Sequence, residues 1–239
     1  MRDFLEMRQI RSVLIWCVAL VWLIPALIFV IVASYLVSAK RYDPIVKKLA
    51  RALFFLMGIR LTIEGRENVD PRQTYLYMAN HISMLDVPLF QAVIPQLARG
   101  VEAEEQFNWP IFGWAIRRAG NIPINRKDVH AAIPSAKETA KRLQEGLSMI
   151  ILPEGGRTLT GKMKPFKKLP FHLAKEGHVP IIPIGVSGLY RVMKKGDWNI
   201  TPGPVQVRFG RPIDQKTIDS LSVPELRDLV RERIKQLID

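Results

Sequence analysis

The sequence has little of what disulfide-linked or metal-bound scaffolds need. Its single cysteine, Cys17, has no partner for an internal disulfide, which fits a reducing compartment. Its four histidines, His81, His130, His172 and His178, do not have the spacing of metal ligands. The sequence therefore predicts neither a disulfide framework nor a metal site.

Acidic residues are scarce relative to basic ones. The chain has 22 Asp and Glu against 35 Lys and Arg, a net charge of +13. Such a surplus calls for an anionic partner, which could be nucleic acid, anionic lipid head groups or phosphorylated substrates. Because no nucleic-acid recognition motif, zinc spacing or basic–aromatic strand signature is present, we expect no nucleic-acid partner and favour lipids. A hydrophobic content of 48% excludes a disordered chain.

Charge is missing altogether from residues 12–39. At about 1.5 Å per residue a helix of this length covers ~42 Å, more than the hydrocarbon core of a bilayer. Pro25 lies near its middle, so the segment is expected to form either one tilted, kinked spanning helix or two shorter helices that turn within one leaflet. A cleaved signal peptide is disfavoured by the length of the apolar run. We expect a membrane anchor here.

The next segment, residues 44–61, is amphipathic. Lys47, Lys48 and Arg51 gather on one helical face, opposite a broad apolar face. Two interpretations stay open: an interfacial helix whose basic side meets anionic membrane lipids, or a core-packing helix with a solvated face. Basic residues are also enriched from residue 40 onward, which by the positive-inside rule places the remaining chain on the cytoplasmic side of the inner membrane.

The chain is expected to divide into an anchor with its interfacial helix, residues 1–61, and an α/β domain, residues 62–239. Short β-rich runs occur at residues 74–79, 121–124, 149–152, 181–186 and 205–209. Helical patterns occur at residues 87–94, 109–119, 135–145 and 166–176, followed by a last helix that begins at a capping box of Ser222 and Glu225. This alternation predicts a sheet covered by helices.

One candidate catalytic pair stands at the end of the first of these strands. His81 follows Asn80 in the turn before a helix, and Asp86 comes five residues later, early in that helix. A histidine can take and return a proton near neutral pH, and a carboxylate on its far nitrogen would fix the tautomer. The alternative is that Asp86 only opposes the helix dipole, in S-x-x-D spacing with Ser83, and that His81 is a buried structural residue.

Two further strand ends carry candidate anion ligands. Glu154, Gly155, Gly156 and Arg157 follow an apolar strand directly, and successive glycines at such a place let backbone N–H groups converge on an anion. Arginine matches phosphate oxygens with two parallel hydrogen bonds. Arg126 ends another β-like run in the same way. A flexible turn with solvated arginines is the alternative. Four lysines behind the glycine turn are either a donor-binding cluster or a solvated patch: Lys162, Lys164, Lys167 and Lys168.

The order of these motifs resembles the glycerolipid acyltransferases of the 1-acylglycerol-3-phosphate acyltransferase kind, over roughly residues 60–212. Four blocks match in sequence: Asn80-His81-(four residues)-Asp86, Gly120 to Arg126, Pro153-Glu154-Gly155-x-Arg157, and Val179-Pro180-Ile181-Ile182-Pro183. The resemblance implies a mixed, mostly parallel sheet flanked by helices and preceded by a membrane-embedded helical segment.

The same resemblance implies the roles of the residues. His81 would be the general base, Asp86 its orienting partner, and Arg126 with the segment Glu154, Gly155, Gly156 and Arg157 would hold the acceptor phosphate. The reaction would move a fatty acyl group from acyl-CoA or acyl-carrier protein to the sn-2 hydroxyl of 1-acylglycerol-3-phosphate, giving phosphatidate in phospholipid synthesis, without a cofactor.

Some positions depart from the pattern of that family. Gly156 stands where threonine is usual, Asn125 where aspartate is common, Leu169 where glycine is frequent, and residues 101–105 are acidic where relatives often carry lysines. These departures keep a second acceptor open, another lysophospholipid or a lyso-aminolipid. A third hypothesis, from a different class, is a non-catalytic basic module that binds membranes.

Overall fold

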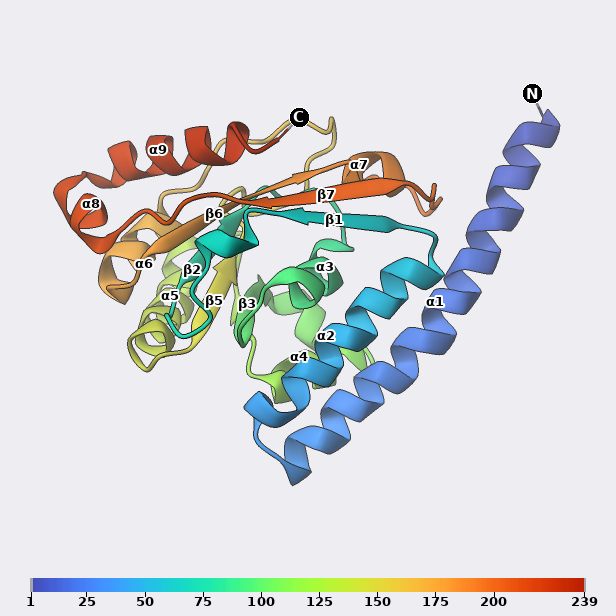
Figure 1. Cartoon of the computed structure of the whole chain (residues 1–239), viewed down its shortest axis with the longest axis horizontal. Coiled ribbons are helices and arrows are strands. Elements are labelled where there is room, and N and C mark those ends of the chain that lie inside the picture. The colour runs from blue at the N-terminus through green and yellow to red at the C-terminus, as the bar shows by residue number, and fades with distance from the viewer. Residues whose placement is uncertain (1, 239) are drawn as a thin grey trace.

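Two long N-terminal helices form a hairpin against an α/β unit in the computed structural model, which describes residues 2–238 (Figure 1). Helix α1 (Arg2–Leu36) is continuous through Pro25, so of the two alternatives for residues 12–39 the pair of shorter helices is wrong and a single helix is present. Among the described residues one helical segment, Glu6–Leu36, is long and apolar enough to cross a membrane. Helix α2 (Ala39–Leu56) turns back beside α1.

The sheet has seven strands in the order β1-β7-β6-β2-β5-β3-β4. Only β6 and β7 pair in antiparallel fashion, so the predicted mixed, mostly parallel sheet is confirmed. Its strands are β1 (Arg60–Glu64), β2 (Leu76–Ala79), β3 (Ala98–Ala103), β4 (Ile122–Ile124), β5 (Ser148–Ile151), β6 (Ile181–Ser187) and β7 (Pro204–Phe209). Strands β1 and β3 were not predicted, and the expected boundary between residues 61 and 62 falls inside β1.

Helices cover both faces of the sheet, as the alternation of strands and helices predicts. The remaining helices are α3 (Asp86–Val93), α4 (Phe112–Ala119), α5 (Val129–Gln144), α6 (Leu169–Gly177), α7 (Leu189–Val192), α8 (Gln215–Ser220) and α9 (Val223–Lys235). In β2, Tyr77 and Ala79 enter the core under α2 and α3, whereas Leu76 and Met78 enter the core under α5, α6 and α9. This period of two is what a strand buried on both faces requires.

One basic residue of helix α2 departs from both interpretations of its sequence. Lys47 is 8% exposed and forms an ion pair with Asp43, and its ammonium also donates to the Gln96 carbonyl. Arg51 donates to the Ala92 carbonyl at the end of α3. Lys47 therefore packs inward, with its charge satisfied by a carboxylate and a backbone carbonyl, whereas Lys48 and Arg51 stay exposed on that side of the helix.

Five neighbouring strands run parallel to one another: β6, β2, β5, β3 and β4. Their carboxyl ends therefore lie at the same edge of the sheet. The segments that follow those strands carry the residues that the sequence singled out: His81 after β2, Arg126 after β4, and Glu154 to Arg157 after β5. Ligands of open α/β sheets bind outside the carboxyl ends of the strands. The fold thus brings the candidate residues to one edge.

Candidate active site

The histidine and the aspartate meet, as the sequence predicts. The His81 Nδ1 lies 2.7 Å from the Asp86 Oδ2, and the side chains are 9% and 1% exposed. The same Oδ2 accepts hydrogen bonds from the backbone N–H groups of Ile82 and Ser83, at 2.8 and 3.1 Å. Asp86 therefore closes the turn before α3 and contacts the His81 imidazole at the same time. The Nδ1 contact leaves Nε2 to act as the base.

Asn80 fixes the end of β2 to the neighbouring strand. Its amide donates to the Val186 carbonyl at 3.0 Å and accepts from the Val186 N–H at 2.8 Å. Asn80 is 5% exposed, so these two bonds are shielded from water. They hold the residue before the base at a set height along β6.

The loop after β5 holds the backbone of His81 on both sides. The Glu154 Oε1 accepts from the His81 N–H at 2.8 Å, and the Thr158 N–H donates to the His81 carbonyl at 3.0 Å. The other carboxylate oxygen of Glu154 accepts from the Lys164 N–H at 2.7 Å. Burial raises the pKa of Glu154, while the two N–H groups act in the opposite direction. Both oxygens of Glu154 are thus engaged by backbone, so this carboxylate positions the base and does not fit the expected role of a phosphate ligand.

The two glycines of this loop serve its shape. Gly155 has a φ of 67°, its N–H donates to the Leu152 carbonyl, and a Cβ there would lie 2.7 Å from the Lys167 Cε. Only glycine combines this backbone conformation with the close approach of a side chain. The Gly156 carbonyl accepts from the Lys164 ammonium at 3.2 Å. The Gly155 N–H is therefore not available to an anion, contrary to the expectation for it.

The two candidate arginines lie close enough to affect each other. Burial lowers the pKa of Arg126, the carboxylates of Glu102 and Glu105 raise it, and Arg157 lowers it. The Lys167 ammonium donates to the Arg126 carbonyl at 2.8 Å and so ties the segment after β4 to the loop that carries Arg157. Within residues 2–238 neither guanidinium group makes a hydrogen bond or a close ion pair. Both are half-buried and can receive an anionic group.

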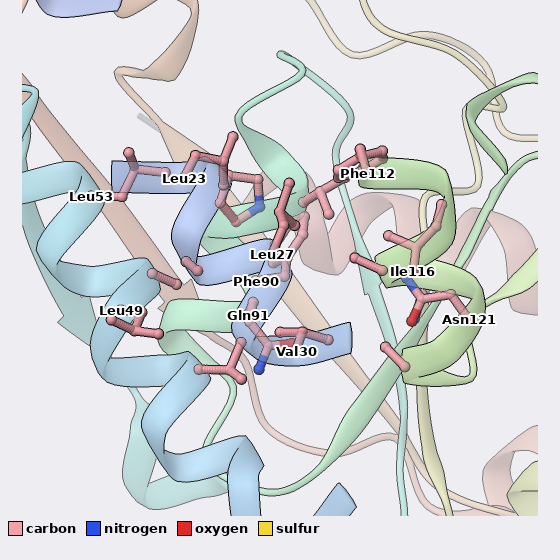
Figure 2. Close-up of a pocket in the computed structure, with 18 of the residues that line it drawn as sticks. Leu23, Leu27, Val30, Leu49, Leu53, Phe90, Gln91, Phe112, Ile116 and Asn121 are labelled. Carbon is pink, nitrogen blue, oxygen red and sulfur yellow. The ribbon is translucent and has the colours of Figure 1, made fainter. Parts of the chain in front are cut away.

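An apolar cavity of about 470 Å³ reaches from the His81 turn to the N-terminal helices. Met84 and Leu85, which follow His81 in the chain, line one part of it. Figure 2 shows further parts of the wall, formed by Leu23, Leu27 and Val30 of α1, Leu49 and Leu53 of α2, Phe90 of α3, and Phe112 and Ile116 of α4. The volume is in the usual range for ligand sites, about 300–1,000 Å³. No pattern in the sequence indicates this cavity, because most of its lining residues have the same apolar types as the cores.

Comparisons with known proteins agree with this arrangement. A family model described as Acyltransferase matches residues 60–187. The 1-acyl-sn-glycerol-3-phosphate acyltransferase of Cocos nucifera is 35% identical over 164 residues, 68% of this chain and 53% of the relative. The 1-acyl-sn-glycerol-3-phosphate acyltransferase alpha of Mus musculus is 35% identical over 179 residues, 74% of this chain and 63% of the relative. The chain thus spans between about half and two thirds of the length of these relatives.

A solved structure matches over almost the whole chain. The crystal structure of the 1-acyl-sn-glycerophosphate (LPA) acyltransferase PlsC from Thermotoga maritima has a TM-score of 0.85 and 27% identity, and the match covers 99% of this chain and 95% of that chain. The family model, the relatives and the fold all point the same way. The chain belongs to the acyltransferase family.

Proposed function

We propose that the protein moves a fatty acyl group from an acyl-thioester to the sn-2 hydroxyl of 1-acylglycerol-3-phosphate, giving phosphatidate. One observation carries the proposal: the His81–Asp86 pair shares a sheet edge with Arg126 and Arg157, which have no ion-pair partner among residues 2–238, and borders an apolar cavity. A base, an anion site and a place for an acyl chain are what this acceptor needs. The relatives named 1-acyl-sn-glycerol-3-phosphate acyltransferase support the same acceptor.

In this mechanism His81 Nε2 removes the proton of the acceptor hydroxyl as that oxygen attacks the thioester carbonyl carbon. Asp86 stabilises the imidazolium that forms. The tetrahedral intermediate then breaks its C–S bond, and the imidazolium returns the proton to the leaving thiolate. The products are an ester and a free thiol, and His81 is neutral again.

The acceptor phosphate is assigned to Arg126 and Arg157. A hydrogen bond to a charged group contributes about 1.5–3 kcal/mol, so Arg157→Ala should raise the acceptor KM about tenfold to a hundredfold with a smaller change in kcat. Glu154 and Gly155 act indirectly, by holding His81 and by shaping the loop. An unchanged acceptor KM in the Arg157→Ala enzyme would remove this residue from the site.

The acyl donor is either acyl-CoA or an acyl-carrier protein. Lys162, Lys164, Lys167 and Lys168 are exposed on the loop that carries Arg157, and their charge suits the phosphates of coenzyme A and the acidic surface of a carrier protein alike. Mass spectrometry of the products formed from mixed lysolipids and mixed donors decides both substrates. Phosphatidate as the main product supports the proposal, and preferential acylation of a different lysophospholipid or a lyso-aminolipid would replace the acceptor.

The membrane contact is assigned to the exposed side of α1, which we place along the bilayer surface. Near its start, Arg8 pairs with Asp197 at 3.0 Å, and near its end Arg118 donates to the Ser34 hydroxyl at 3.0 Å. Both ends of α1 thus contact the same α/β unit. A helix that crosses the bilayer would have its two ends on opposite sides of the membrane and could not make both contacts. The exposed stripe includes Ile10, Leu14, Val21, Ile28, Val32 and Leu36. The leaflet is assigned to the cytoplasmic side of the inner membrane from the charge bias.

The native cysteine offers a direct test, because Cys17 is exposed on α1. A spin label on Cys17 and one on Ile28→Cys in a Cys17→Ser background should report similar depths in vesicles. A helix that crosses the bilayer would separate the two depths by up to ~16 Å, at about 1.5 Å per residue. A depth difference of that size would overturn the surface arrangement.

A further inference from the structure

One carboxylate in the cavity has no role in the mechanism so far. Glu102 lies near the carboxyl end of β3 and lines the cavity together with Gly100 and Asn121. Its carboxylate rests against Gly100, where a Cβ would overlap the Glu102 Oε1. In the part of the chain that the structure describes, no hydrogen bond or close ion pair engages Glu102.

The neighbouring acids differ from Glu102 in this respect. Glu104 accepts a hydrogen bond from Asn125 at 2.6 Å, and Glu105 pairs with Lys127 at 3.3 Å, both on the exposed surface. Their charges are balanced outside the cavity. Of the three acids in residues 101–105, only Glu102 faces the space where substrates would bind.

The surroundings of Glu102 connect the base with the phosphate site. The charged groups that act on it are Arg126, after β4, and Asp86, at the start of α3. The uncharged amide of Asn121 lies beside Gly100, as the Glu102 carboxylate does, and uncharged Gln106 also lines the cavity. An acceptor whose hydroxyl reaches His81 and whose anionic group reaches Arg126 must therefore pass beside this carboxylate.

We propose that Glu102 is a specificity-determining residue that contacts the acceptor head group and admits head groups that present a hydrogen-bond donor to it. For the acceptor of the proposed function, on which this inference rests, that donor is the one proton that a phosphate monoester can keep. Two adjacent anions repel each other, but one proton between them makes a short charge-assisted O–H···O⁻ hydrogen bond. A phosphodiester head group that ends in a quaternary ammonium has no such donor and is disfavoured.

Burial supports this assignment, since it raises the pKa of Glu102 to about 7, against a smaller lowering by Arg126. Below that pH the free enzyme already holds the shared proton. Above it, binding of the phosphate dianion has to take up a proton from solution, so the acceptor KM should rise by up to about tenfold for each pH unit.

The test compares the native enzyme with Glu102→Gln, which keeps the size and hydrogen-bonding capacity of the side chain without its charge. With 1-acylglycerol-3-phosphate as acceptor, the native KM should rise between about pH 7 and about pH 8.5, and the KM of the variant should stay level. The ratio of kcat/KM for 1-acylglycerol-3-phosphate over 1-acylglycerol-3-phosphocholine should fall at least about tenfold in the variant. Glu104→Gln is the matched control and should behave as the native enzyme.

The inference would be overturned if KM depended on pH in the same way in the native enzyme and in Glu102→Gln. This includes the case in which the substitution changes KM by one constant factor at every pH, because such a change indicates only a general charge effect. Failure of the proposed function looks different. In that case the native enzyme shows no activity with 1-acylglycerol-3-phosphate at any pH, while it acylates another acceptor in the same panel.

Discussion

At His81, directional hydrogen bonds hold the imidazole and both backbone groups of one residue, whereas the cavity beside it is enclosed mainly by apolar side chains, which pack without such bonds. The difference follows from what each region has to do. A base must stand within a fraction of an ångström of its proton, while an acyl chain is bound in proportion to the apolar area it buries. Substitutions at the sheet edge should therefore change kcat, whereas substitutions in the cavity should change the preferred length of the acyl chain.

The largest effect is expected at the base. His81→Ala removes the group that takes the hydroxyl proton, so kcat should fall by about 10²- to 10⁴-fold. The acceptor KM should change little, because the arginines remain. Steady-state kinetics on the purified variant, with circular dichroism to verify folding, measures this. Near-normal turnover would place the base elsewhere.

The role of the cavity in acyl-chain selection is tested by filling part of the cavity. Val30 is 7% exposed and lies on the α1 wall of the cavity (Figure 2). Val30→Trp should exclude the last methylenes of a long chain, each of which contributes about 0.8 kcal/mol, so two of them reduce kcat/KM about tenfold. Long-chain and medium-chain donors are compared in one assay. Val129→Trp, at an exposed position on α5, is the matched control, and an equal loss with both chain lengths would contradict the division of roles.

A third prediction concerns Glu102, which lies where the two regions meet. A folded-state pKa of about 7 against an ordinary 4.5 means that the native protein binds this proton more tightly than the unfolded chain. The associated stability is therefore complete at low pH and is lost as the pH rises toward 7. Between about pH 5.5 and about pH 8 the native protein should lose ~2 kcal/mol of unfolding free energy relative to Glu102→Gln. Denaturant titrations at the two pH values measure the difference, and a constant offset would contradict the raised pKa.

The smallest effect is expected outside both regions. The Ser222 hydroxyl accepts from the Glu225 N–H and caps α9, which packs on the opposite face of the sheet. Ser222→Ala should lower the unfolding free energy by about 1 kcal/mol and leave kcat and chain preference unchanged. Thermal unfolding and the two-donor assay together check this. A change in kcat or in chain preference in this variant would show that α9 also affects catalysis.

The sequence was most informative where chemistry depends on short spacing. His81 and Asp86 are five residues apart across one turn, so a local pattern was sufficient to predict their contact. The capping box of Ser222 and Glu225 was predicted for the same reason and is present. Helix α5 begins six residues earlier than expected, at Val129, because the Asp128 carboxylate caps it ahead of Pro134.

Features that depend on distant partners could not be predicted in this way. Lys47 reads as a head-group ligand until Asp43 and the Gln96 carbonyl are seen to enclose it. Glu154 reads as part of a phosphate site, yet its partners are backbone groups 73 residues before it and 10 residues after it. The role of Glu102 depends on which face of β3 borders the cavity, and strand β3 itself was not predicted.

The hairpin of α1 and α2 is more than an attachment to lipid, since Leu23, Leu27 and Leu53 stand in the wall of the cavity. A shortened chain that starts after Ser38 would keep the whole sheet and the His81–Asp86 contact, and it would dissolve more readily. It would also leave one side of the hydrophobic compartment open to water. Efforts to obtain a soluble enzyme should therefore retain this hairpin and cover it with detergent or a lipid nanodisc, instead of removing it.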